Sequence, residues 1–247
     1  MDQLQRAITE LTIANRILAH ENVVDAYGHV SLRHPVHSDR YLLACSRSPE
    51  LVEREDIMEF TFDGKAVGDD KRPPYLERFI HGGIYAARPD IQAVVHAHSE
   101  DVLPFGISPV ALVPVIHSGS VLGARIPVWD IAERFGTDTN LLVTNIEQGQ
   151  DLAQALGAER AVLMRGHGFA AAGRNLLEVL RISIFMPRNA RVQQAAMRMG
   201  GFKSLNPGEI AARGAIFQPG SSEVMRAWEY WARRAGCEQL LAELARP

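Results

Sequence analysis

Two histidines in the middle of the sequence have the spacing of metal ligands. His96 and His98 directly follow the apolar run Ala93-Val94-Val95, which predicts a short buried strand. Residues i and i+2 of a strand point to the same side, so both imidazoles can bind one cation. Two histidines at a strand end that hydrogen-bond to the backbone or to water would show the same pattern, so the pair alone leaves both interpretations open.

A third histidine strengthens the metal interpretation. His167 also follows a short apolar segment, residues 161–164, and it lies between Gly166 and Gly168, which allow a backbone or a ligand to approach closely. Three neutral imidazoles with an open coordination position are typical of a catalytic metal centre and not of a closed structural one. The sequence alone does not bring His167 to the other two histidines.

The composition limits the kind of protein that could contain such a site. The chain has 247 residues, a net charge of −3 and 47% apolar residues, which predicts a globular chain of one large domain or at most two. Its two cysteines cannot form a disulfide framework, and we expect reduced thiols in a cytoplasmic protein. No signal-sequence pattern, apolar run of about 20 residues or basic patch is found, so we expect no secretion, membrane span or nucleic-acid partner.

Strands in the middle of the chain, with helices before, between and after them, predict a single mixed α/β domain. Helices are expected at residues 4–21, 76–87, 99–103, 175–199 and 221–245, with a kink at Pro187 and a looser stretch over 200–220. Strands are expected at residues 27–33, 41–45, 93–95, 110–116, 126–131 and 161–164, with a hairpin turn at Asp63-Gly64. We divide the chain into a domain, 1–215, and a C-terminal helical extension, 216–247, which packs on the same domain or on a neighbouring subunit.

Three motifs together give the sequence a family resemblance. Glu77, the segment Val95-His96-Ala97-His98-Ser99 and the turn Gly166-His167-Gly168 resemble the class II aldolase/adducin family, and Glu77 precedes His96 by the 19 residues typical of that family. Gly28–Arg33 resembles its N-terminal glycine turn, and His81 resembles a histidine one helical turn after the glutamate. The resemblance covers roughly residues 4–200.

The resemblance implies a fold, a cofactor and an assembly. The fold would be a central, mainly antiparallel β-sheet flanked by helices. One divalent ion per subunit would bind to His96, His98 and His167, with manganese or zinc preferred over iron or cobalt. Glu77 would be the acid–base residue, with its pKa raised toward neutral by burial. The chain would form a homotetramer or a larger homo-oligomer, with the active site near a subunit boundary.

The sequence departs from the sugar-phosphate members of this family where they bind phosphate. Tyr75-Leu76 replaces a pair of serines, and His29 replaces an asparagine, so a phosphorylated substrate is disfavoured. Ser46 and Arg47 lie in a loop that supplies further phosphate contacts in those enzymes. The Arg47 guanidinium suits a carboxylate, although a solvated surface arginine would give the same sequence.

Segments 28–35, 165–168 and 228–231 are similar to one branch of the family, the metal-dependent decarboxylases of hydroxylated aromatic and pyridine carboxylic acids. We therefore expect a carbon–carbon lyase that decarboxylates a small aromatic (di)carboxylate through an enolate-like intermediate chelated by the metal. Tyr230 with its neighbouring tryptophans could add an aromatic wall to the site or could belong to the core. His117 could be a further pocket residue or an ordinary loop histidine. The expected substrate-binding residues are His29, Ser46, Arg47, Tyr75, His117 and Tyr230.

Two other functions stay open at this stage. An aldolase that cleaves a non-phosphorylated hydroxy-keto acid would use the same metal ligands and Glu77, so the motif does not separate it from a decarboxylase. A non-enzymatic binding module of the adducin type is disfavoured, because the adducin domain lacks the metal histidines.

Overall fold

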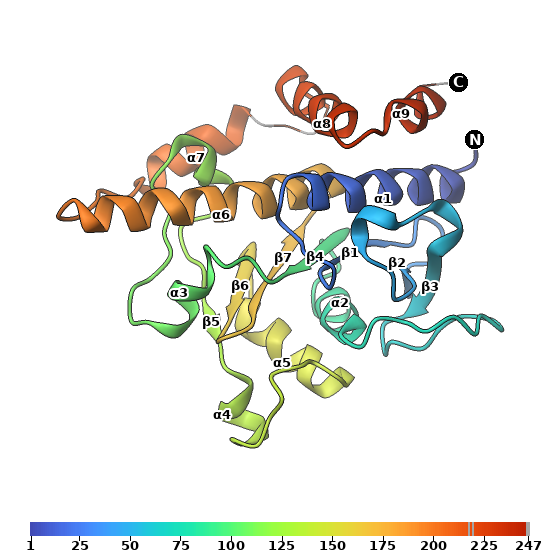
Figure 1. The fold of residues 1–247 in the computed structure, drawn as a ribbon, viewed down its shortest axis with the longest axis horizontal. Coiled ribbons are helices and arrows are strands. Elements are labelled where there is room, and N and C mark those ends of the chain that lie inside the picture. Colours follow the sequence, from blue (N-terminus) through green and yellow to red (C-terminus); the bar gives the residue numbers. More distant parts are fainter. Residues whose placement is uncertain (217, 219, 246–247) are drawn as a thin grey trace.

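The computed structural model describes residues 1–216, 218 and 220–245 (Figure 1). Within these residues, seven strands form one sheet in the order β3-β2-β1-β4-β7-β6-β5, and all neighbours are antiparallel except β5 and β6. The strands are β1 His29–Arg33, β2 Arg40–Ala44, β3 Ile57–Thr61, β4 Ala93–Ala97, β5 Val128–Trp129, β6 Ala161–Met164 and β7 Gly168–Gly173. This arrangement confirms the predicted mixed α/β domain with a mainly antiparallel sheet.

Helices cover both faces of the sheet. The α-helices are α1 Gln3–His20, α2 Arg78–Ala87, α3 Leu103–Ile107, α4 Ile131–Phe135, α5 Ile146–Leu156, α6 Leu176–Arg198, α7 Pro207–Ile216, α8 Ser222–Arg234 and α9 Glu238–Leu244. The 3-10 helices are η1 Pro49–Leu51, η2 Arg54–Asp56 and η3 His117–Leu122. The long helices α1 and α6 cross one face, and α2 and α5 lie on the other (Figure 1). The apolar core therefore lies on both sides of β1, β4, β7 and β6.

Two local features position the layers around the sheet. Asp2 caps α1 by accepting a hydrogen bond from the Gln5 amide, and the buried residues Leu11, Ala14 and Leu18 recur at helical spacing along it. On the opposite face, a Cβ atom at Gly83 of α2 would lie 2.3 Å from the backbone of Gly149 on α5. Only glycine permits this contact, so α5 packs tightly against the helix that follows Glu77.

The segment 110–116 is not a strand, contrary to the sequence prediction. Its backbone is extended but hydrogen-bonds to side chains of α6: Val113 N–H donates to Gln193, and the Asn189 amide donates to the Val113 carbonyl. Buried polar side chains thus replace a neighbouring strand as hydrogen-bond partners. The predicted strand 126–131 shortens to β5, whereas β7 was not predicted because its alanine-rich sequence has low strand propensity.

The helix predictions also need corrections at several ends. The predicted helix 221–245 is two helices, because Gly236 adopts a positive φ of 70° and ends α8. The loose stretch 200–220 contains α7, and the helix expected at 99–103 begins at Leu103 instead. The α6 helix runs through the buried Pro187 without interruption. The hairpin at Asp63-Gly64 is confirmed, with Thr61 N–H donating to the Lys65 carbonyl.

The C-terminal helices pack on the same chain. Trp228 and Trp231 of α8 are buried in the common core, and Arg54 pairs with Glu243 of α9 at 2.6 Å. Part of the predicted extension 216–247, namely residues 217, 219, 246 and 247, lies outside the described residues, and the division at 215/216 stays a prediction. Among the helices of the described part, none is both long and apolar enough to span a membrane.

Candidate metal centre

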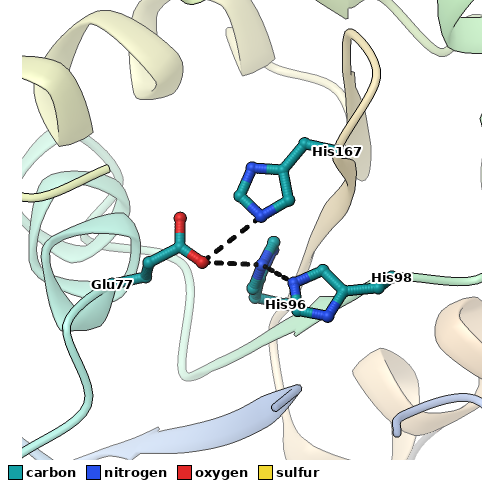
Figure 2. Close-up of side chains that lie close together, drawn as sticks. All are labelled: Glu77, His96, His98 and His167. Atoms are coloured by element: carbon teal, nitrogen blue, oxygen red, sulfur yellow. Dashed lines mark hydrogen bonds and ion pairs between the residues drawn. The ribbon is translucent and has the colours of Figure 1, made fainter. Parts of the chain in front are cut away.

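Four side chains converge where strands β4 and β7 meet helix α2 (Figure 2). His96 lies in β4, His98 directly follows that strand, and His167 lies in the turn between β6 and β7. Glu77 is the N-cap residue of α2, so the predicted helix start at residue 76 was slightly early. One possible ligand atom from each residue lies within 4.8 Å of all the others. The structure thus brings His167 to the other two histidines.

Strand pairing explains how His167 reaches His96. Strand β7 pairs with β4, with His96 opposite Ala170, and the tight turn before β7 puts His167 at the same end of the sheet. A Cβ atom at Gly168 would lie 2.1 Å from the Ala97 carbonyl oxygen, so glycine is required for this approach. Gly166 has a positive φ of 66° and makes the turn possible.

Hydrogen bonds on the far side of each imidazole set its orientation. The Nδ1–H of His96 donates to the Phe169 carbonyl at 3.0 Å, and the Nδ1–H of His167 donates to the Leu141 carbonyl at 2.9 Å. The Nδ1 atom of His98 lies 3.3 Å from the Asp25 carboxylate. Each of these partners is an acceptor, so each histidine carries its proton on Nδ1 and turns the Nε2 lone pair toward the centre.

This arrangement is unfavourable without a cation. The Nε2 atoms of His96 and His98 are 2.9 Å apart, and neither carries a hydrogen to donate to the other when Nδ1 is the protonated atom. The anionic oxygen Oε2 of Glu77 lies 3.4 Å from His96 Nε2 and 3.3 Å from His167 Nε2 (Figure 2). Converging lone pairs and one carboxylate form a donor set that fits a divalent metal ion.

The carboxylate of Glu77 is buried and stays ionised. Burial by itself raises its pKa, but the neighbouring His96 and His167 lower it, and the net pKa of Glu77 lies well below its usual range. The sequence-based expectation of a raised pKa is therefore wrong in direction, because it considered burial and not the imidazoles. The second oxygen, Oε1, accepts a hydrogen bond from the Val143 amide at 2.9 Å, which fixes the side chain.

A loop that the sequence analysis missed holds two members of this centre. The Leu141 carbonyl binds His167, and the Val143 amide binds Glu77. Leu141 has a φ of +67°, a left-handed conformation that is unusual and strained for leucine, and strained residues of this kind cluster at functional sites. No sequence signal distinguishes this leucine, and Asp25 was missed for the same reason.

A cavity of about 790 Å³ opens onto the centre. Four of the predicted substrate-binding residues line it, and its lining also includes Glu77, His98 and His167. These four are His29, Ser46, Arg47 and Tyr75. The other two predicted residues lie elsewhere: His117 is exposed at the start of η3, and Tyr230 is 55% exposed on α8. The tryptophans beside Tyr230 belong to the core and not to this cavity.

Arg47 is held at the edge of the cavity. Its Nε atom donates to the Leu51 carbonyl at 2.6 Å and lies 3.1 Å from Asp56. The side chain is 47% exposed, and within the described residues no hydrogen bond involves its two Nη groups. The Tyr75 hydroxyl donates to the Arg47 carbonyl and ties the loop to the cavity wall. The geometry is compatible with a carboxylate partner for Arg47 and also with a solvated arginine.

A buried chain of hydrogen bonds leads away from His29. Its Nδ1 lies 2.6 Å from His81 Nε2, His81 Nδ1 lies 2.6 Å from Ser31 Oγ, and Ser31 Oγ lies 2.8 Å from the Tyr85 hydroxyl. The next acceptor for Tyr85, the Gln92 carbonyl, is 3.5 Å away, so the Tyr85 hydrogen goes to Ser31. Ser31 then donates to His81, and His81 donates to His29, which leaves the His29 proton on Nε2.

Comparisons with known proteins identify the family and its relatives. Residues 9–194 match the model of the class II aldolase and adducin N-terminal domain. The chain is 35% identical to the decarboxylase tropJ of Talaromyces stipitatus, covering 93% of this chain and 94% of that protein. It is 26% identical to 3,4-dihydroxyphthalate decarboxylase of Arthrobacter keyseri, covering 89% and 90%.

Solved structures give the same result for the fold. An aldolase II superfamily protein from Pseudomonas syringae superimposes with a TM-score of 0.79 at 20% identity, covering 97% of this chain and 96% of that one. An L-fuculose 1-phosphate aldolase from Glaciozyma antarctica has a TM-score of 0.71 at 20% identity, covering 99% and 93%. The family match spans most of the sequence and includes all four converging side chains, so the chain belongs to the class II aldolase and adducin N-terminal domain family.

Proposed function

We propose that this protein is a metal-dependent decarboxylase of a hydroxylated aromatic or pyridine (di)carboxylic acid. The observation that carries the proposal is the convergence of three imidazoles and one carboxylate beside a cavity whose lining includes Arg47 and aromatic rings. Relatives over nearly the full length that are named as decarboxylases, one of them for 3,4-dihydroxyphthalate, support carboxylate chemistry.

The metal would bind to His96, His98 and His167, with manganese or zinc as our first choices and iron or cobalt as alternatives. A divalent ion bound there would supply Lewis-acid stabilisation of the charge that develops on substrate oxygens. Glu77 could complete this donor set or act on the substrate, since its Oε2 lies equally near His96 and His167.

Glu77 is the proposed carrier of the proton that replaces the carboxyl group. The carboxylate is ionised and therefore carries no proton of its own, so Oε2 is the proposed acceptor of the proton of the substrate's phenolic hydroxyl. The bond between the ring and the carboxyl carbon then breaks, carbon dioxide leaves, and the electron pair stays on the ring. Glu77 returns its proton to that ring carbon, and the phenolate later recovers a proton from solvent.

Other residues of the cavity would orient the substrate. His29 presents an Nε2–H donor, fixed by His81 behind it, that suits a carboxylate or phenolate oxygen. Tyr75, whose ring lies 4.6 Å from that of His29, offers a flat wall for an aromatic ring. Arg47 would bind a second carboxylate through its Nη groups, and Ser46 lies beside it.

We further propose a cytoplasmic homotetramer or larger assembly with the cavity near a subunit boundary. Two large apolar side chains that line the cavity support this assembly. Tyr27 is 73% exposed and Leu76 is 65% exposed in the single chain, and a neighbouring subunit would cover them. Size measurement by light scattering tests the assembly, and a monomer at micromolar concentration would contradict it.

The decisive experiment is a substrate panel with the protein reconstituted separately with each of the four metals. The panel includes 3,4-dihydroxyphthalate, a hydroxypyridine dicarboxylate, non-phosphorylated hydroxy-keto acids and fuculose 1-phosphate, with carbon dioxide and aldehyde both measured. We expect carbon dioxide from an aromatic acid. Aldehyde from a hydroxy-keto acid, without carbon dioxide from any aromatic acid, would establish the aldolase alternative.

A further inference from the structure

A second cavity, of about 600 Å³, lies between η3, α6 and α7 and shares no lining residue with the metal centre. Four arginines line it: Arg160, Arg174, Arg181 and Arg213. The acidic residue in the same lining is Glu178, so the lining carries a net charge of +3. A concentration of cationic charge inside a cavity is a physical signature of anion binding.

The carboxylate in this lining is already engaged by two of the arginines. Glu178 accepts hydrogen bonds from Arg174 at 3.0 and 3.2 Å and lies 3.8 Å from Arg160. Asp90 and Glu223 influence Arg174 and Arg213 electrostatically but do not line the cavity. If the negative charges of Asp90 and Glu223 are added to the charge of the lining, the net charge of the region is still positive.

Arg181 is a buried arginine of this cavity, with 9% of its surface exposed. Burial and the proximity of Arg213 together lower the pKa of Arg181 to about 10. Arg181 and Arg213 line the same cavity, and an anion bound in it would offset the repulsion between their like charges. Guanidinium groups bind carboxylate and phosphate oxygens in pairs, which makes oxyanions the matching ligands.

The helix α6 adds to the positive potential. Its N-cap residue Asn175 lines the cavity, and 23 residues of helix follow it. The N-terminal end of a helix carries a partial positive charge that favours anions. This contribution is secondary to the arginines, because the Asn175 side chain already accepts a hydrogen bond from the Glu178 amide.

We propose that this cavity binds a small oxyanion with two or more negative charges, held by Arg160, Arg181 and Arg213. Phosphate and polycarboxylate ions share the required chemistry, and two probes separate them: inorganic phosphate and tricarballylate. The site is independent of the metal centre, so the proposal does not rest on the proposed decarboxylase activity.

The test measures binding of each probe to the metal-loaded full-length protein by isothermal titration calorimetry and by thermal unfolding at constant ionic strength. The variants are Arg213→Gln and Arg181→Gln, and the matched control is Arg198→Gln, which removes the same charge from the exposed end of α6. We expect at least one probe to bind, with affinity reduced about tenfold or more in both cavity variants and unchanged in the control.

Each possible result has a defined meaning. Binding of either probe with this mutational pattern supports the site, and the preferred probe identifies phosphate or carboxylate as its ligand. Binding that is equal in the wild type and in Arg213→Gln would place the anion elsewhere, for example at the metal, and would overturn the proposal. Absence of binding by both methods at 10 mM probe, about the weakest affinity of interest, would also overturn it. Because Arg213 is only partly buried on α7, that variant decides the question if Arg181→Gln does not fold.

Discussion

The metal centre and the arginine cavity both concentrate groups that repel one another, but they hold those groups differently. At the metal centre, the histidine side chains come from strand β4, from the residue after it and from one tight turn, and backbone carbonyls orient His96 and His167. In the arginine cavity, long side chains reach in from helices and loops, and Arg174 and Arg160 share Glu178. The first site is pre-organised for one ion of fixed geometry, whereas the second can adapt to an anion of less definite shape.

Removal of a metal ligand tests this contrast with the largest expected effect. His96→Ala should abolish stoichiometric metal binding and lower turnover by about 10³-fold or more, since a metal ion supplies several kcal/mol of transition-state stabilisation. Elemental analysis and the carbon dioxide assay measure both effects. Anion binding at the arginine cavity should stay unchanged. The exposed His37→Ala is the matched control, and full metal content in His96→Ala would refute the proposed ligand set.

Replacement of Glu77 separates its two possible roles. Glu77→Gln keeps the shape but removes the ionised oxygen, so turnover should fall by about 10²–10⁴ with the metal retained. Glu100→Gln, an exposed neighbour of the metal histidines, is the control and should remain fully active. If the metal is lost from Glu77→Gln, the carboxylate is a required ligand, and if turnover survives, it has no acid–base role.

The sequence predicted much more of the metal centre than of the arginine cavity, for a geometric reason. A strand puts residues i and i+2 on one side, so the spacing of His96 and His98 by itself indicates that their side chains converge. Arg160, Arg181 and Arg213 have no such spacing. They line one cavity only because α6 and α7 both pack against η3. Long-range packing also determines the extended segment at 110–116, where side chains of α6 replace a strand partner.

The loop that carries Leu141 and Val143 illustrates the same limit inside the metal centre. Its contribution is made by a backbone carbonyl and a backbone amide, which every sequence contains, so no side-chain pattern could reveal it. The family resemblance supplied Glu77, but the low pKa of Glu77 follows from the positions of His96 and His167, which the motif alone does not give.

A smaller effect is expected from removing Asp25, which contacts the metal ligand His98 from outside the centre. Asp25 is half exposed and lies 3.3 Å from His98 Nδ1, so Asp25→Ala should weaken metal affinity by about 10-fold, the lower end of the range for such partners. The affinity is measured by competition with a chelator, and the exposed Asp39→Ala is the control. Equal metal affinity in both variants would show that Asp25 does not orient His98.

The buried histidine chain predicts a pH dependence of stability. Burial lowers the pKa of His81 to about 3, so the neutral form is favoured in the folded state. The stabilisation is fully present above the unfolded pKa of about 6.5 and is lost as pH falls from there toward 3, at roughly 1.4 kcal/mol per pH unit. His81→Gln should flatten the urea-derived stability curve over this range by up to about that slope. A curve parallel to that of the wild type would contradict the assignment.

The smallest effect on catalysis is expected from replacing Arg47, an arginine that lines the cavity of the metal centre. Like the arginines of the second cavity, Arg47 could bind an oxyanion, but it is half exposed and its Nε is already engaged by Leu51 and Asp56. Solvent screening should limit its contribution, so Arg47→Ala should raise KM for a dicarboxylate by about tenfold or less and leave kcat nearly unchanged. A monocarboxylate analogue should show no such increase, and the exposed Arg125→Ala should alter neither substrate. An equal rise in KM for both substrates would mean that Arg47 shapes the loop through Asp56 and does not recognise the second carboxylate.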